Sequence, residues 1–260
     1  MDRSIGIAVT GIERDLRDAA EPAIAAGFSQ GAIAVAYAKK ALMALSADQR
    51  PAPDRLTFVT IGDPTGAGGI LRTLHFRVPL IHLTPFAPPD TPYDTVIVNG
   101  EYDGWADFPD RQWNLVSVVN ALLGTIYVHG GYETIPGGLD LSTVPLANIT
   151  TTVNSLGGTT TTYLLPTEKL PLVQPLRDIG VSERIVTAIE KSLKRVVDKG
   201  YLRNDAAQAK IAQSTPPSTA KGPVPATPAP REIRNPERRA AAGSPRRTAL
   251  RSSGRSAAAA

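Results

Sequence analysis

Residues 27–31 read GFSQG and have the pattern G-x-S-x-G, in which a serine lies on a sharp turn between a strand and a helix. The two glycines leave room for the strained backbone and for close packing of the helix on the strand. A serine on such a turn acts as a nucleophile when a histidine within hydrogen-bond distance removes its proton. The last of the three histidines, His129, lies in a glycine-rich loop after an apolar stretch. Ser29 and His129 therefore predict attack on a carbonyl carbon, with the histidine as general base.

Three aspartates compete for the role of the acid that orients His129. In α/β folds that carry a serine on such a strand–turn–helix, the catalytic residues follow in the chain order serine, acid, histidine. Asp103 lies in the loop directly beyond residues 96–98, a short apolar strand. Catalytic groups in open α/β sheets gather at the carboxyl ends of the strands, where a carboxylate can hold the imidazole in one tautomer. Asp103 is the favoured acid, while Asp107, four residues later, and Asp63, at the end of an earlier apolar strand, stay as alternatives.

The other two histidines come too early in the chain for this order. His75 and His82 lie in residues 71–83, where apolar and polar residues alternate as in a strand, and both precede the favoured acid. We interpret them as structural or surface imidazoles.

The elements around these residues predict an α/β fold. Residues 22–26 are short and apolar, as in a buried strand, and residues 32–42 are rich in alanine with two lysines near their end, as in a helix. The apolar residues 115–128 predict a core helix that delivers His129, and a glycine pair within residues 154–166 predicts a hairpin. The order of these segments favours a parallel sheet flanked by helices.

A wider resemblance covers the chain from about residue 25 to residue 201. The motifs GFSQGA, FVTIGDPTGAGGIL, DTPYDTVIVNGEYDGWADFPD, YVHGGYE and TYLLPTEKLPLVQPL follow one another. In this order they resemble the mycobacterial PE-PPE domain, a serine-hydrolase module with a cutinase-like α/β-hydrolase fold, and the stretches YDGWADFP and LPTEKLPL are specific. The resemblance implies Ser29 as nucleophile, Asp103 as acid and His129 as base. It also implies that the backbone N–H of Gln30 contributes to the oxyanion hole.

The chain departs from the family pattern at its beginning. In the family, a strand and a glycine-containing loop precede this region and supply a second oxyanion donor, whereas residues 5–20 read as a single helix with a polar face. We therefore expect an N-terminally truncated sheet with an exposed hydrophobic edge. Loss of one oxyanion donor typically lowers turnover by about 10²–10³. A catalytically impaired envelope or interaction protein of this family is thus one alternative to an active enzyme.

Charge and composition divide the chain into two parts. Residues 1–200 hold 17 basic and 21 acidic residues, whereas residues 201–260 hold 11 and 3. The first part therefore offers no basic face for nucleic acid. From residue 204 onward Pro, Ala, Ser and Arg dominate, and large apolar residues are almost absent. We predict a hydrolase domain over residues 1–203 and a disordered basic tail over residues 204–260 that can contact an anionic membrane surface.

Composition argues against several kinds of site and segment. The chain has no cysteine, which excludes disulfides and thiolate chemistry. Three scattered histidines argue against a metal site, and no cofactor is predicted. The first 25 residues carry charges throughout, unlike a signal peptide. The longest apolar stretch, residues 115–128, is too short to span a bilayer.

The residues and the resemblance together predict a serine esterase or lipase-type acyl hydrolase that acts on acyl esters through a Ser-Asp-His triad. Water completes hydrolysis, whereas a sugar or lipid hydroxyl completes acyl transfer. An acyltransferase acting on envelope glycolipids is therefore a second alternative. The resemblance implies an acyl ester or lipid as the substrate and a cell-envelope or secreted location.

Overall fold

The computed structural model describes residues 2–18, 22–73, 84–135 and 137–205. All of them belong to one compact unit, Met1–Pro216. His75, His82 and residues 206–260 of the predicted basic tail lie outside the described residues. In the described part of the chain, no helix combines the length and the apolar character needed to cross a membrane.

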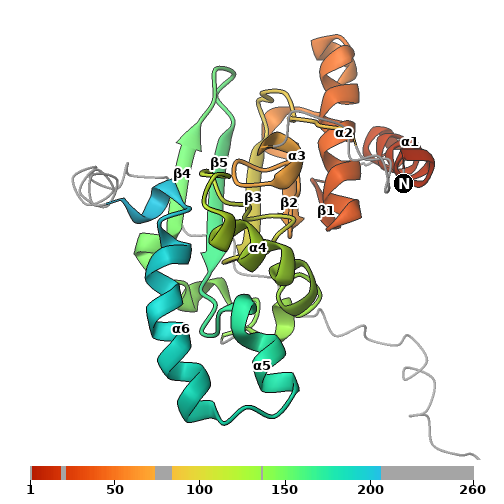
Figure 1. Ribbon diagram of the computed structural model, residues 1–260. Helices are drawn as coiled ribbons and strands as arrows, with labels where there is room; N and C mark the ends of the chain where they lie inside the picture. Colours follow the sequence, from red (N-terminus) through yellow and green to blue (C-terminus); the bar gives the residue numbers. More distant parts are fainter. Residues whose placement is uncertain (1, 19–21, 74–83, 136, 206–260) are drawn as a thin grey trace, which may run out of the picture. The chain divides into compact units, whose positions relative to one another are not determined.

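A five-stranded mixed sheet forms the centre of this unit. Its strands are β1 (Ala23–Phe28), β2 (Leu56–Ile61), β3 (Asp94–Gly100), β4 (Ile149–Val153) and β5 (Thr159–Leu165). They lie in the order β1-β2-β3-β5-β4, with β1, β2, β3 and β5 parallel and β4 antiparallel to β5 (Figure 1). The predicted parallel sheet is confirmed for four strands. The predicted hairpin turns at Gly157, whose φ is +86°, and adds the antiparallel strand.

Helices connect and flank the strands. They are α1 (Asp2–Asp18), α2 (Gln30–Ala44), α3 (Ile70–Thr73), α4 (Leu115–Tyr127), α5 (Gln174–Asp178) and α6 (Glu183–Asp198). The helices predicted before and after the serine turn and before His129 are confirmed as α1, α2 and α4. The α/β class predicted from the sequence is therefore confirmed.

The strand-like alternation expected over residues 71–83 is wrong at its beginning. Ile70–Thr73 form α3, and the side chains of Ile70 and Leu71 are both buried in a cluster with residues of α2 and α4. A strand covered on one face buries only alternate side chains, whereas a helical turn can bury two consecutive ones. Burial of both side chains therefore favours a turn of helix here.

Different segments cover the two faces of the sheet. On one face, α2 packs Val35 and Leu42 against Leu56 and Phe58 of β2. On the other face, the segment that follows α4 packs apolar side chains against β3 and β5. The segments that carry Ser29 and His129 thus approach the carboxyl ends of the parallel strands from different sides.

Strand β1, which leads to Ser29, lies at an edge of the sheet. Among the described residues it pairs only with β2, and the pairing continues to the Ser29 N–H, which donates to the Ile61 carbonyl at 2.9 Å. Ile24 and Phe28 of β1 are 71% and 47% exposed. The hydrophobic edge expected from the sequence is therefore present, and it lies beside the serine.

Candidate active site

Ser29 lies on a strained turn between β1 and α2. Its backbone has φ 54° and ψ −113°, a conformation that residues with a side chain rarely adopt. Such a conformation costs on the order of 1–3 kcal/mol and persists only where its surroundings hold it. Here the Ser29 N–H donates to Ile61 of β2, and the Ser29 carbonyl accepts from Ala32 and Ile33 of α2. The turn is therefore held from both the strand and the helix.

The two glycines of the G-x-S-x-G pattern have different roles. A Cβ at Gly27 would overlap the backbone carbonyl group of Gly31, so only glycine lets β1 and α2 approach this closely. A Cβ at Gly31 would meet no atom within 4 Å. The expectation that both glycines are needed for close packing is therefore wrong for Gly31.

We expect Gly27→Ala to lower the free energy of unfolding by about 1–3 kcal/mol, because the added methyl group forces β1 and α2 apart. Gly31→Ala is the matched control. The same methyl group has free space there, and alanine is favoured over glycine within a helix by up to about 1 kcal/mol. Urea denaturation of the two variants measures the difference. Equal destabilisation by both would contradict the steric role of Gly27.

His129 lies between Ser29 and Asp103 and is hydrogen-bonded to both. Its Nε2 atom lies 2.7 Å from Ser29 Oγ, and its Nδ1 atom lies 2.7 Å from Asp103 Oδ2. Asp103 is completely buried, His129 is 9% exposed, and Ser29 is half-buried. The structure thus brings together the three residues that the sequence analysis selected, with the carboxylate innermost.

Close contact between α4 and the loop after β3 positions His129 against Asp103. A Cβ at Gly124 of α4 would overlap the Tyr102 carbonyl, so backbone packs directly on backbone. The His129 N–H donates to the Gly124 carbonyl at 3.0 Å, which turns the chain immediately after the helix. With no side chain between helix and loop, the distance between imidazole and carboxylate has little freedom to vary.

Asp103 accepts two further hydrogen bonds besides its contact with His129. The Trp105 N–H donates to Oδ1 at 2.8 Å, and the Tyr132 hydroxyl donates to Oδ2 at 2.7 Å. The same hydroxyl accepts from the Gly100 N–H at 2.8 Å. Burial and the nearby Asp103 carboxylate raise the pKa of Tyr132 well above its usual value, so the phenol stays protonated as a donor.

Aromatic rings surround the imidazole of His129. The Phe28 ring stacks on it with centroids 5.3 Å apart and an interplanar angle of 23°. The rings of Trp105 and Tyr132 lie at 6.2 and 6.4 Å. Sequence reasoning selected none of the three rings for the site. The available signals were the position of Phe28 directly before the serine and the spacing of Tyr132 three residues after His129.

Asp107, one alternative acid, is engaged in an ion pair. It accepts a two-point contact from the Arg203 guanidinium, at 2.7 and 2.9 Å, and a hydrogen bond from the Tyr102 N–H at 2.7 Å. Burial raises the pKa of Asp107 to about 6, although the guanidinium acts in the opposite direction. Its environment is that of a buried structural carboxylate.

Asp63, the other alternative acid, accepts hydrogen bonds from a residue of its own loop. Its Oδ1 atom accepts from the N–H and the hydroxyl of Thr65, at 2.8 and 2.7 Å. Among the described residues, Asp103 is the only one of the three aspartates that is hydrogen-bonded to His129.

The first turn of α2 presents N–H groups beside Ser29. The helix begins at Gln30, and the N–H groups of Gln30 and Gly31 donate to no backbone carbonyl of the described residues. The Gln30 side chain donates to Ser4 Oγ at 2.7 Å, which ties the start of α1 to this turn. The positive end of α2 can therefore stabilise a negative charge that develops next to the Ser29 hydroxyl.

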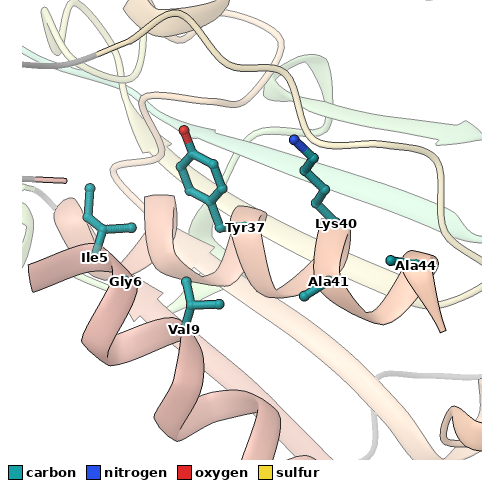
Figure 2. Close-up of a pocket in the computed structure, with 7 residues that line it drawn as sticks. All are labelled: Ile5, Gly6, Val9, Tyr37, Lys40, Ala41 and Ala44. Carbon is teal, nitrogen blue, oxygen red and sulfur yellow. The ribbon is translucent and has the colours of Figure 1, made fainter. Parts of the chain in front are cut away.

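An apolar groove of about 550 Å³ lies between α1 and α2. Figure 2 shows the residues that line it: Ile5, Gly6 and Val9 of α1, and Tyr37, Lys40, Ala41 and Ala44 of α2. One end of the groove lies at Ile5, next to the Ser4 that binds Gln30. From there the groove follows α2 away from the serine turn.

Comparison with known proteins relates this chain to one domain family. The family model of the PE-PPE domain matches residues 1–202. The chain is 39% identical over 215 residues to the diacyltrehalose acyltransferase Chp2 of Mycobacterium tuberculosis (strain ATCC 25618 / H37Rv), which covers 78% of this chain and 58% of that protein. It is 41% identical over 184 residues to the esterase PE16 of the same strain, with 68% and 33% covered. It is 33% identical over 201 residues to the SL1278 acyltransferase Chp1, with 76% and 48% covered.

The chain spans little more than half of the length of the first of these relatives and less of the other two. No solved structure matches it. The family match extends over the whole described sheet and over Ser29, Asp103 and His129. The chain therefore belongs to the PE-PPE domain family, whose domain has an α/β-hydrolase-like fold.

Proposed function

We propose that the chain is a serine esterase of the lipase type that hydrolyses acyl esters through Ser29, His129 and Asp103. The observation that carries this proposal is the continuous hydrogen-bonded line from Ser29 Oγ, through both ring nitrogens of His129, to the buried Asp103 carboxylate. A strained serine at the start of a helix, followed by an acid and a histidine, has the geometry that nucleophilic acyl transfer requires.

The proposed reaction proceeds through a serine ester. Ser29 Oγ attacks the carbonyl carbon while His129 Nε2 takes the hydroxyl proton. Asp103 holds the proton on Nδ1 and stabilises the imidazolium that forms, and Tyr132 keeps Asp103 in place. The Gln30 N–H donates to the oxygen on which negative charge develops. His129 then gives its proton to the leaving alcohol. Water attacks the serine ester in the same way, with His129 as the base, and releases the carboxylic acid and the free Ser29 hydroxyl.

Two observations support an acyl ester or lipid as the substrate. One relative is named an esterase and two are named acyltransferases. The apolar groove between α1 and α2 begins near the serine turn and has the apolar walls that a hydrocarbon chain requires (Figure 2). We assign the acyl chain to this groove and the ester carbonyl to the space above Ser29.

Acyl transfer is the second candidate function, because two of the relatives are named diacyltrehalose and SL1278 acyltransferases. The serine ester would be the same, and a lipid or sugar hydroxyl would attack it in place of water. The proposal places the catalytic unit in residues 1–203 and the protein at the cell envelope, with residues 204–260 as a basic tail that contacts anionic lipid.

A fluorophosphonate probe tests the proposal, because it reacts with a serine that a neighbouring base activates. We expect the full chain to be labelled at Ser29, as mapped by mass spectrometry. His129→Ala should lower the labelling rate by at least about 10²-fold. A folded but unlabelled chain would refute the proposal and indicate a non-catalytic member of the family.

A further inference from the structure

A second cavity, of about 450 Å³, lies on the face of the sheet that α2 covers only in part. Its volume is within the range of roughly 300–1,000 Å³ that is typical of ligand sites. Side chains of β2, β3, β4 and β5 line it, together with Lys39 of α2 and Asp63 of the loop after β2. Neither Ser29 nor His129 lines this cavity, so it is distinct from the candidate active site.

Six threonines, which we call the threonine face, line this cavity on the sheet side. One row crosses β3, β5 and β4 and consists of Thr95, Thr160 and Thr152. The next row crosses β2, β3, β5 and β4, and apart from Ile97 of β3 it consists of Thr60, Thr162 and Thr150. Residues paired in register point to the same side of a sheet, and all six line the cavity. Each hydroxyl can donate one hydrogen bond and accept others.

Thr60 is buried in this face without a partner for its hydroxyl. The residue is 2% exposed, and no group of the described residues is hydrogen-bonded to its Oγ1 atom. The high propensity of threonine for strands is sufficient to explain threonines on a solvated sheet. It does not explain Thr60, because a buried hydroxyl without a hydrogen-bond partner costs free energy. The cavity beside Thr60 is the place where a partner for this hydroxyl would lie.

Lys39 brings a positive charge into the same cavity. It is 8% exposed, and its Nζ atom donates to Thr95 Oγ1 at 2.8 Å and lies 4.8 Å from the centre of the Phe58 ring. Burial lowers the pKa of Lys39 to about 8, while the negative charge of Asp63 acts in the opposite direction. An ammonium has three N–H donors, and among the described residues only Thr95 accepts from this one. Lys39 therefore has hydrogen bonds left to give to a ligand.

Asp63 supplies the matching acceptor. It is 4% exposed, and its Oδ1 atom accepts from Thr65, which leaves Oδ2 without a hydrogen-bond partner among the described residues. Because Lys39 and Asp63 line the same cavity, their charges offset each other. The cavity therefore offers a donor in Lys39, an acceptor in Asp63, and threonine hydroxyls that can donate and accept. Because Lys39 and Asp63 carry opposite charges, this buried end has little net charge.

We propose that this cavity binds a neutral sugar ring through the threonine face, Lys39 and Asp63. A sugar ring presents neighbouring hydroxyls that each donate and accept, as the lining side chains do. The lining holds two cations, Lys39 and Arg72, and two carboxylates, Asp63 and Asp90, so it has no net positive charge to favour an anion. An apolar ligand would leave the threonine hydroxyls unpaired. A free sugar and the sugar of a glycolipid share this chemistry. The proposal does not depend on the reaction at Ser29.

Calorimetric titration of the full chain with D-glucose tests the proposal. We expect binding, and we expect Thr162→Val to weaken it about five- to tenfold, as the loss of one hydrogen bond implies. Thr161→Val is the matched control, because the next residue of β5 makes the same substitution on the opposite face of the sheet. Fluorophosphonate labelling of Ser29 should be the same in both variants, since neither residue contacts the candidate active site.

Octyl β-D-glucoside, titrated below its micellar concentration, separates the two sources of the sugar. Tighter binding than glucose, weakened by Thr162→Val to the same extent, would indicate a glycolipid headgroup, whereas equal binding of both would indicate a free sugar. The proposal is overturned if neither compound binds the folded chain or if Thr161→Val weakens binding as much as Thr162→Val. Binding of inorganic phosphate in place of both sugars would also overturn it, because the cavity would then be an anion site of Lys39.

Discussion

Ser29→Ala is expected to abolish ester hydrolysis, with kcat for p-nitrophenyl butyrate falling on the order of 10⁴- to 10⁶-fold. Without the hydroxyl, no serine ester forms and the proton acceptor His129 Nε2, 2.7 Å away in the native chain, has no nucleophile to activate. The activity that is left would come from binding and from the N–H groups at the start of α2 acting on water.

Two measurements accompany this prediction. Thermal unfolding of Ser29→Ala should occur close to the native temperature, because the strained backbone is held by hydrogen bonds of the main chain with Ile61 and Ala32. Ser192→Ala, an exposed serine of α6, is the control and should retain full activity. Native turnover in Ser29→Ala would mean that the hydrolysis occurs at a different site or in a contaminating enzyme.

Asp103→Asn is expected to lower kcat by about 10⁴-fold. The neutral amide can no longer stabilise the imidazolium of His129, and it allows the ring to adopt the tautomer whose Nε2 cannot accept the serine proton. The side chain should keep its place, because it is completely buried and the Trp105 N–H still has an oxygen to donate to. The KM for the same ester should change little, since Asp103 is too deep to contact the substrate.

Asp107→Asn is the matched control, because it makes the same chemical change four residues along the same loop. Here the loss is expected in stability, by about 3 kcal/mol in the free energy of unfolding, since the Arg203 guanidinium loses its two-point partner inside the protein. The kcat of the folded Asp107→Asn fraction should stay within tenfold of the native value. If Asp107→Asn lowered kcat as strongly as Asp103→Asn, the assignment of Asp103 as the acid would be wrong.

Local patterns were sufficient to predict the elements that carry the candidate site. The apolar residues before the serine, the alanine-rich stretch after it and the apolar residues 115–128 became β1, α2 and α4. Hydrogen bonding and burial repeat over two to four residues in such elements, so a short window of sequence contains the signal. The chain order of serine, acid and histidine then selected Ser29 and His129 from few candidates, and these side chains are hydrogen-bonded in the structure.

The same patterns did not discriminate between the candidate acids or between the two glycines of the serine turn. Asp103 and Asp107 follow the same strand, and only the path of the loop between them turns one carboxylate to His129 and the other to Arg203. The G-x-S-x-G pattern likewise does not say which glycine is in close contact. The contact of Gly27 with the Gly31 carbonyl depends on the angle at which α2 leaves β1.

The amino-acid sequence by itself determined the fold class, the order of the chemical groups and the membership in the PE-PPE domain family. Only the tertiary structure decided that Tyr132 binds Asp103 across 29 residues and that Lys39 binds Thr95 across 56 residues. The reason is physical. Elements form from interactions between near neighbours, whereas these contacts depend on how α2, α4 and the loops pack on the sheet. That packing is set by all of the buried side chains together.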